Sequence, residues 1–484
     1  MNKDRVDVIV VGAGIAGLAA ANVSAASGLR TLLLERGEPE TYACNSRIAT
    51  GALGVAHSDA SADPEILRRA IFDDTEGHAD PDLARLIGAN AGHALAWLRA
   101  EGVEMRQTRE NGRTRWAMEP ARPDRPGQQW KGLGPDRALT RLVARLRSRN
   151  GQIEFRTRAR ELIMKDGACV GIRAECGEGA RNYIACDYLA RTVILADGGF
   201  QANRDLLRAH VTPAPERLIQ RNAGTGRGDA LLMARAIGAQ TVDLNAFYGH
   251  LLVQEALTNA EWWPYPTLDS LAGGAIIVDQ SGRRFVDEGL GGIVISNAIA
   301  RLEDPMSTTA IFDEAIWAEC GRIEFVAPNP FLTKLGARIH VGASIGELAQ
   351  SLGLPAARLE RTVGTYNSHV DSDKLSRLNP IRTPGRPFGA LRTAPNRLPT
   401  RAVRQAPFYG IRLGVGITYT EGGILIDSHC RALDVDRRPI VGLLAAGSCT
   451  GGLEGGPFAG YIGGYMKSVV TGLRAGETAC ADGR

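Results

Sequence analysis

The sequence contains no apolar run long enough to cross a membrane. A transmembrane helix needs about 18 consecutive apolar residues, and no segment of the 484-residue chain reaches that length. The first residues, Met1 to Arg5, lead directly into an apolar stretch and show no A-x-A cleavage pattern of a secretory signal. We therefore expect a cytoplasmic protein without a membrane span.

Cysteine pairs of the kind that bind metals are also missing. The eight cysteines are spread from Cys44 to Cys480 and form no C-x-x-C pair, so the sequence encodes neither an iron–sulfur cluster nor a structural zinc site. The net charge is only +4, and the basic stretches 106–125 and 137–149 contain a single aromatic residue, Trp116, and no interleaved aromatic pattern. We expect solvated surfaces there, no metal and no nucleic-acid partner.

Glycine, by contrast, is abundant. The chain has 58 glycines without a collagen-like period, well above the usual share of ~7%. Glycine allows tight turns and lets the backbone approach a ligand closely. The hydrophobic and charged shares, 44% and 23%, are those of a globular protein, and the length is sufficient for two or three domains.

A dinucleotide-binding βαβ unit is encoded at the start of the chain. The apolar run 6–11 predicts a buried parallel strand, and the loop after it carries Gly12, Gly14 and Gly17 before an Ala-rich helical stretch. Residues 31–34 predict a second strand that ends at Glu35. Two of the glycines would allow the tight turn and the approach of N–H groups to a pyrophosphate, and the third the close packing of the helix.

The acid at the tip of the second strand narrows the choice of nucleotide. Glu35 follows Gly17 by eighteen positions, which places its carboxylate where a ribose diol would donate hydrogen bonds. A 2′-phosphate would be repelled there, so FAD or NAD is favoured over NADP.

The rest of the chain alternates between helical and strand patterns. Helices are expected at 64–76, 81–101, 135–149 and 225–238, a long loop, often the form of a lid, at 107–134, and strands at 153–163, 168–175, 181–188, 191–195 and 439–444. Between about 246 and 404 the composition shifts toward aromatics and prolines, with a hairpin-like stretch at 274–285 and helices at 313–320, 345–352 and 356–370. We predict an α/β Rossmann-type domain formed by residues 1–245 and 405–484, interrupted by an α+β capping domain at 246–404.

Six further stretches, in this order, resemble the fumarate reductase/succinate dehydrogenase flavoprotein superfamily, which includes 3-ketosteroid dehydrogenases and tricarballylate dehydrogenase. They are Asn45–Gly51, Val193–Phe200, Thr225–Asp229, Gly282–Glu288, Glu421–Gly423 and Gly442–Gly447. The resemblance implies an FAD-binding domain with a mobile cap and a substrate held between the two against the flavin. Relatives that attach FAD covalently carry a histidine where this chain has Asn45, so the resemblance implies noncovalent FAD.

Glycine pairs at strand ends leave room for a cofactor, and small polar residues can satisfy its phosphates and ring heteroatoms. The cofactor-binding residues we expect are Gly12, Gly14, Ala16, Gly17, Glu35, Arg36, Asn45, Ser46, Thr50, Gly51, Ala159, Asp197, Gly198, Gly199, Thr225, Gly226, Asp229, Gly447, Ser448, Tyr461 and Ile462.

The catalytic pattern departs from that of fumarate reductases. Where the family has a proton-donating arginine, a clamping arginine and a clamping histidine, this chain has Trp317, Phe458 and Tyr419. A buried dicarboxylate without cationic partners would meet a large desolvation cost. Fumarate and succinate are therefore disfavoured as substrates.

Aromatic and hydroxyl side chains take the place of the missing cations. Tyrosines act as acid and base in the ketosteroid dehydrogenases that the chain resembles, so Tyr419 and Tyr461 become candidates, the latter only if its helix turns it inward. Thr420 lies beside Tyr419, and His250 is near the position of a substrate-binding histidine in relatives. We expect Tyr419, Tyr461, His250 and Thr420 to act on a small, weakly charged ketone or carboxylic acid.

The leading hypothesis is an FAD-dependent dehydrogenase, or the reverse reductase, acting on a C–C bond next to a carbonyl. A base would remove the α-proton while the β-hydrogen leaves as hydride to flavin N5. An oxidase or hydroxylase that uses O₂, and a flavin electron-transfer subunit of a larger complex, remain as alternatives. The partners expected are a small-molecule substrate and an electron acceptor or donor that the sequence does not identify.

Overall fold

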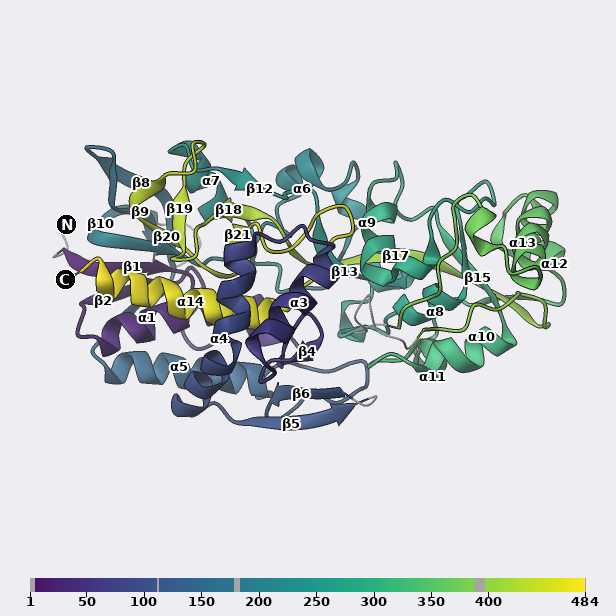
Figure 1. The fold of residues 1–484 in the computed structure, drawn as a ribbon, viewed down its shortest axis with the longest axis horizontal. Helices are drawn as coiled ribbons and strands as arrows, with labels where there is room; N and C mark the ends of the chain where they lie inside the picture. Colours follow the sequence, from purple (N-terminus) through teal and green to yellow (C-terminus); the bar gives the residue numbers. More distant parts are fainter. Residues whose placement is uncertain (1–4, 111–112, 178–182, 388–396, 484) are drawn as a thin grey trace.

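The computed structural model describes residues 5–110, 113–177, 183–387 and 397–483. Figure 1 shows an elongated molecule with the dinucleotide-binding part at one end and the inserted part, from β13 to α13, at the other. No helix within the described ranges is long and apolar enough to cross a membrane.

A parallel sheet forms the centre of the dinucleotide-binding part. Its strand order is β19-β20-β10-β1-β2-β7, and β1, β2, β10 and β20 run parallel. The bounds of these strands are Val6–Val11 for β1, Thr31–Leu34 for β2, Gln152–Glu154 for β7, Tyr183–Leu195 for β10, Arg431–Leu433 for β19 and Pro439–Ala445 for β20. The βαβ unit predicted at the start of the chain is confirmed.

Helices cover this sheet and place its glycine turn. Helix α1 (Ile15–Ala26) begins directly after the turn and packs against α14 (Gly464–Ala481) and α5 (Gly134–Ser148). Asn22 on α1 donates through Nδ2 to the carbonyl of Leu142 on α5 at 3.0 Å. The packing of α1 therefore fixes its N-terminus at the carboxyl ends of the strands, where open α/β sheets bind nucleotides.

A mixed sheet organises the inserted part. Its long strand β17 (Phe408–Thr420) pairs with β13 (Phe247–Val253), β15 (Thr309–Asp313), β16 (His340–Gly342) and β11 (Ile219–Gln220). The helices α8 (Asp269–Gly274), α9 (Gly292–Ala300), α12 (Ile345–Leu352) and α13 (Ala356–Asp371) belong to the same end of the molecule (Figure 1). Strands of this sheet come from both sides of residues 246–404, and the domain boundaries stay a prediction.

The region expected as a single loop, 107–134, is partly structured. Strands β5 (Met105–Glu110) and β6 (Arg113–Met118) pair with each other, and β6 pairs with β3 (Ala52–Val55). Among the residues of this region that the structure describes, only 119–133 lie outside helix and strand. The prediction was wrong for 107–110 and 113–118, because the mostly polar residues of both strands show no apolar alternation that would indicate a strand.

Candidate functional site

The turn between β1 and α1 leaves no room for side chains. Gly12 has a φ of +99°, and a Cβ there would lie 2.7 Å from the carbonyl oxygen of Ala196. A Cβ on Gly17 would lie 1.9 Å from the carbonyl oxygen of Gly12. These contacts bring the turn against the end of β10 and aim the N-terminus of α1 into the groove that follows, where an anionic group is favoured.

Glu35 closes the groove at the end of β2. Its Oε2 accepts a hydrogen bond from the Ala13 amide and its Oε1 one from the Gly37 amide, both at 2.8 Å. Burial raises the pKa of the Glu35 carboxyl, while the two amide hydrogen bonds oppose that shift. The carboxylate is thus fixed in one position, with lone pairs left for ribose hydroxyls.

The segment that contains Thr225 and Asp229 docks on the neighbouring corner. Arg36 donates to the carbonyl of Thr225, and Arg158 forms a bidentate pair with Asp229 at 2.8 and 2.9 Å. Asp197 accepts from the Ala230 amide at 2.9 Å through Oδ2. Segments that are distant in sequence are therefore held together around one groove.

Two acceptors in this groove have no protein donor among the described residues. They are Oδ1 of Asp197 and Oε1 of Gln201, both buried. Burial raises the pKa of Asp197 to about 7. Because buried acceptors are normally satisfied, these atoms fit a ligand that carries hydroxyl or amino donors, and the glycine turn fits its phosphates. The residues present suit a dinucleotide.

Most of the expected cofactor-binding residues line the groove. Those that do are Gly12, Gly14, Ala16, Glu35, Arg36, Asn45, Ser46, Ala159, Asp197, Gly198, Gly199, Thr225, Gly226, Asp229, Gly447 and Ser448. Gly17 lies behind the turn and Gly51 beside Pro135. Ile462 is buried and donates its amide to Glu454, whereas Thr50 and Tyr461 line a second cavity.

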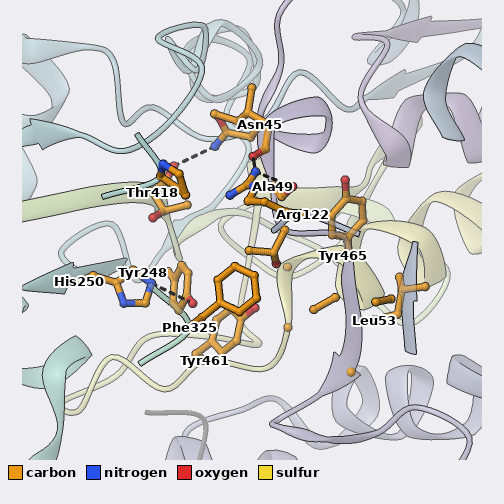
Figure 2. Close-up of a pocket in the computed structure, with 18 of the residues that line it drawn as sticks. Asn45, Ala49, Leu53, Arg122, Tyr248, His250, Phe325, Thr418, Tyr461 and Tyr465 are labelled. Carbon is orange, nitrogen blue, oxygen red and sulfur yellow. Dashed lines mark hydrogen bonds between the residues drawn. The ribbon is translucent and has the colours of Figure 1, made fainter. Parts of the chain in front are cut away.

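The second cavity lies where the inserted part meets the dinucleotide-binding part (Figure 2). Its volume is about 540 Å³. The groove and the cavity share five lining residues: Ile15, Asn45, Ser46, Ser448 and Ser468. A ligand that extends along the groove therefore reaches the cavity at this junction.

A bulge in β17 helps to build the junction. Tyr248 is paired with Tyr419 but Gly249 with Ile417, so Thr418 is an extra residue in β17. Asn45 donates to the Thr418 carbonyl at 2.8 Å. Bulges are common beside active sites because they redirect side chains, and here the bulge joins the inserted sheet to the groove.

Arg122 places a guanidinium on the cavity wall. It donates to the carbonyls of Ile48 and, at 2.9 Å, Ala49, and its Cζ lies 4.0 Å from the ring centre of Trp263. Its Nε is buried with no partner among the described residues. Burial and the nearby charge of Arg221 lower the pKa of Arg122 to about 9, so the group is cationic at neutral pH.

Arg221 is a second cation in the cavity. Its Nη1 donates to the Thr418 hydroxyl at 3.3 Å, and its Nε is also buried without a partner in the described structure. Burial lowers the pKa of Arg221, whereas the charges of Asp269 and Glu324 act in the opposite direction. The cavity therefore has cationic groups, although they come from positions other than the three family positions considered in the sequence.

Aromatic rings form the opposite wall of the cavity. Tyr248 stacks on Tyr461, with centroids 4.1 Å apart and an interplanar angle of 20°, and Tyr419 lies 5.5 Å from Tyr248. The Tyr419 hydroxyl donates to Oε1 of Glu454 at 2.8 Å. Glu454 in turn pairs with the fully buried Lys467 at 3.1 Å, so the Tyr419 hydroxyl is held by a buried ion pair.

His250 stands behind Tyr248, as Figure 2 shows. Its Nε2 lies 3.1 Å from the Tyr248 hydroxyl and its Nδ1 2.6 Å from Oδ2 of Asp269. Burial lowers the pKa of His250 against the opposing effect of Asp269. Burial also raises the pKa of Tyr248 well above its ordinary value, with a further contribution from Tyr461.

The remaining residues from the sequence comparison lie elsewhere. Thr420 is buried, and its hydroxyl accepts from the Phe200 amide at 3.1 Å; it does not line the cavity. Trp317 packs with Phe312 and Tyr409 inside the inserted part. Phe458 is also absent from the lining. Of the four expected catalytic residues, the structure therefore brings Tyr419, Tyr461 and His250 together.

Sequence reasoning missed several residues that line the two sites. They are Arg122, Arg221, Tyr248, Trp263, Tyr265, Glu324 and Tyr465 in the cavity and Thr157, Arg158 and Gln201 in the groove. Tyr248 could have been found, because it is two positions before His250 on one strand and side chains at that spacing share a face. The two arginines follow no local pattern, since one is in the 119–133 connection and the other follows a two-residue strand.

Comparison with known proteins gives one family. A family model described as an FAD binding domain matches residues 7–460. The NADH:fumarate oxidoreductase of Klebsiella pneumoniae (strain 342) is 26% identical over 490 residues, covering 99% of this chain and 48% of that protein. A urocanate reductase of Eggerthella lenta is 26% identical over 476 residues, covering 92% of this chain and 70% of that protein. The chain thus spans about half the length of the first relative.

A solved structure shows the same fold. The 3-ketosteroid Δ1-dehydrogenase of Sterolibacterium denitrificans superposes with a TM-score of 0.75 at 18% identity, covering 99% of this chain and all of that one (100%). At this identity the likeness concerns the fold. It agrees with the predicted Rossmann-type domain that carries an inserted α+β part.

Proposed function

The chain belongs to the FAD-binding flavoprotein superfamily of the fumarate reductases and is an FAD-dependent oxidoreductase, and from this premise we propose its reaction. The substrate is a ring-bearing acid with a single negative charge. The enzyme adds hydrogen to, or removes it from, a carbon–carbon bond conjugated with a carbonyl or carboxylate. The chain acts on this substrate in the cavity between its two parts.

FAD supplies a two-electron hydride donor or acceptor when it is bound. The residues suited to hold it are those of the groove: Glu35 for the ribose, the turn at Gly12 and Gly14 for the pyrophosphate, and Asn45 and Ser46 for the portion that reaches the cavity. The side chain of Asn45 is already committed to the Thr418 carbonyl and the Ala223 amide. This supports noncovalent binding, because an amide is no nucleophile.

The observation that carries the proposal is the unpaired guanidinium of Arg122. Its charge faces the cavity, and the charged or titratable side chains that act on it are Arg221 and Tyr465, with no carboxylate among the described residues. A buried cation without a counter-ion is costly, and a substrate carboxylate would remove that cost. Arginine also matches a planar carboxylate through parallel N–H donors.

Arg221, the second arginine, does not require a second carboxylate on the substrate. The charge of Asp269 acts on Arg221, so the charge of Arg221 is partly balanced within the protein. A dianion would place its second charge near this acid. The electrostatics therefore support one negative charge on the substrate and disfavour fumarate and succinate.

The shape and lining of the cavity support a ring. The stacked Tyr248 and Tyr461, together with Phe325, form an aromatic wall (Figure 2). Aromatic rings prefer offset or tilted contact with other flat groups. The cavity volume of about 540 Å³ is larger than a small acyclic acid would fill, even when the flavin occupies part of the cavity.

The proposal is tested by anaerobic turnover of the purified holoenzyme. The dithionite-reduced protein is mixed with cinnamate, urocanate, cyclohex-2-enone and fumarate, and the flavin absorbance and the products are followed. We expect reoxidation by the ring monoanions with formation of their saturated acids. Reoxidation by fumarate alone, or by oxygen alone with stoichiometric peroxide, would overturn the proposal.

A further inference from the structure

We propose that the hydroxyl of Tyr248 transfers the substrate proton and that His250 and Asp269 act behind it as positioning residues. The inference rests on the proposed function, because it needs a C–H bond that is made or broken. It is carried by a hydrogen-bonded chain that begins at the cavity and ends inside the inserted part.

Asp269, at the inner end of the hydrogen-bonded chain, is firmly fixed. Asp269 accepts from the Leu251 amide at 2.8 Å through Oδ1, and its Oδ2 lies 2.6 Å from Nδ1 of His250. A Cβ on Gly292 would lie 2.1 Å from Cγ of Asp269, so the start of α9 packs directly on the carboxyl group. Asp269 is 1% exposed and His250 2%.

This arrangement determines the tautomer of the imidazole. An ionised carboxylate only accepts hydrogen bonds, so Nδ1 of His250 carries the proton and donates to Asp269. Because burial lowers the pKa of His250, the ring is neutral near pH 7 and Nε2 presents a lone pair toward the Tyr248 hydroxyl. The Tyr248 hydroxyl, 3.1 Å away, therefore donates to Nε2.

Tyr248 differs in this respect from the other tyrosines of the cavity. The hydroxyl of Tyr419 donates to Glu454, and that of Tyr465 donates to the carbonyl of Ser46. Tyr461 stacks on Tyr248, and for Tyr461 and Tyr265 the described structure records no hydroxyl partner that could take up a proton. The His57 ring lies 5.5 Å from that of Tyr461, but among the described tyrosines of the cavity only the Tyr248 hydroxyl is recorded in a hydrogen bond with an imidazole.

In the dehydrogenation direction, the substrate proton moves to Tyr248 and the Tyr248 proton moves to His250. The α C–H bond breaks, its proton bonds to the Tyr248 oxygen, and the Tyr248 O–H proton passes to Nε2 of His250, which becomes an imidazolium paired with Asp269. The electron pair of the C–H bond forms the carbon–carbon double bond. Bound FAD would serve as the oxidant and take up the β-hydrogen with its own electron pair. Reduction runs in reverse from the imidazolium form of His250, which takes up one proton from solvent in each turnover.

The groups that face Tyr248 favour this role. The cation of Arg221 acts to lower the pKa of Tyr248 against burial, Tyr461, Asp269 and Glu324, which raise it. Arg221 therefore stabilises negative charge that develops on the Tyr248 oxygen in the transition state.

The first test is Tyr248→Phe in the holoenzyme. General acid–base catalysis contributes about 10²- to 10⁴-fold, so we expect single-turnover flavin oxidation by cinnamate to slow by at least about 100-fold. The dissociation constant for benzoate, read from the flavin spectrum, should stay within threefold because the carboxylate site is intact. Tyr409→Phe, whose hydroxyl binds Glu314 in the inserted part, is the matched control and should keep the wild-type rate. An equal rate in Tyr248→Phe refutes the assignment.

The positioning residues are tested by Asp269→Asn. An amide can donate to Nδ1 and shift the proton to Nε2, which then no longer accepts from Tyr248. We expect a slowed rate with a changed pH profile and no further loss in the double variant with Tyr248→Phe. His340→Gln is the control, because His340 lies on the remote strand β16 and binds Ser351 of α12. Multiplying losses in the double variant would show that Asp269 acts only through folding.

A spectroscopic measurement separates this inference from the proposed function. In ¹⁵N-labelled holoenzyme we expect His250 to show a protonated Nδ1 and an unprotonated Nε2 whose resonance shifts in Tyr248→Phe. If the wild-type enzyme turns over none of the acids yet shows this tautomer, the proposed function fails and the hydrogen-bonded chain stands. If the neutral ring carries its single proton on Nε2 at pH 7, the relay is refuted even when the acids are turned over.

Discussion

Replacing Arg122 by glutamine should weaken the binding of singly charged ring acids and leave neutral analogues largely unaffected. A hydrogen bond between charged partners contributes about 1.5–3 kcal/mol, and ~1.4 kcal/mol corresponds to a tenfold change in affinity. Because Nε of Arg122 has no partner among the described residues, at least one such bond is available to the ligand. We therefore expect the dissociation constant of benzoate to rise about 10- to 150-fold.

The assay is a titration of the flavin absorbance with benzoate and, in parallel, with the neutral benzamide. Benzamide should bind the Arg122→Gln variant and the wild type within threefold. Arg412→Gln is the matched control, because Arg412 also donates to a backbone carbonyl, that of Leu352, but lies outside the cavity. The flavin content of each variant is measured first, since Arg122 also binds the carbonyls of Ile48 and Ala49.

Two results would refute this reasoning. If benzoate and benzamide lose affinity equally, Arg122 acts through the structure of the cavity and not through its charge. If neither loses affinity, the carboxylate binds elsewhere, and Arg221 becomes the group to replace.

Three further predictions concern the cofactor and the acids of the cavity. Gly12→Ala should abolish FAD retention, because its Cβ would lie 2.7 Å from the Ala196 carbonyl. Gly28→Ala, at a φ of +83° with no atom within 4 Å, should keep its FAD and lose only about 1–2 kcal/mol of stability; equal flavin-to-protein ratios would contradict this. Burial raises the pKa of the Glu324 carboxyl from 4.5 to about 8. Between these two pH values the folded protein keeps a proton that the unfolded chain releases. The free energy of unfolding therefore falls as the pH rises from 4.5 to about 8. Thermal melts of Glu324→Gln should show a smaller decrease between pH 5 and 9 than those of the wild type. Denaturation should release all the flavin because Asn45 forms no bond to it; flavin that stays with the denatured chain would contradict noncovalent binding.

The parts of the fold that the sequence predicts are those whose signals are local. The glycine turn, the strand before it and Glu35 lie within thirty residues, and each has one stereochemical requirement that glycine or an acid meets. Helices such as α12 (Ile345–Leu352) were predicted at their observed bounds because their apolar period and caps are local as well.

The substrate cavity was harder to predict because distant segments assemble it. Arg122 and Arg221 approach each other only after the connection 119–133 and strand β11 have found their places. The meeting of Tyr248 with Tyr419 depends on the register of β13 and β17 and on the bulge at Thr418, which no local pattern specifies. The sequence therefore shows Trp317, Phe458 and Tyr419 at the three positions compared with the family, but it does not predict the arginines that enter the cavity from other segments.

The central claim is that the cavity takes a ring-bearing acid with one negative charge and moves hydrogen at its conjugated double bond. The most direct measurement is the second-order rate constant for reoxidation of the reduced holoenzyme by cinnamate, cinnamamide and fumarate under anaerobic stopped flow. We predict that cinnamate reacts at least tenfold faster than either the neutral amide or the dianion, with 3-phenylpropionate as product. A faster reaction with fumarate, or equal rates with cinnamate and cinnamamide, would contradict the account.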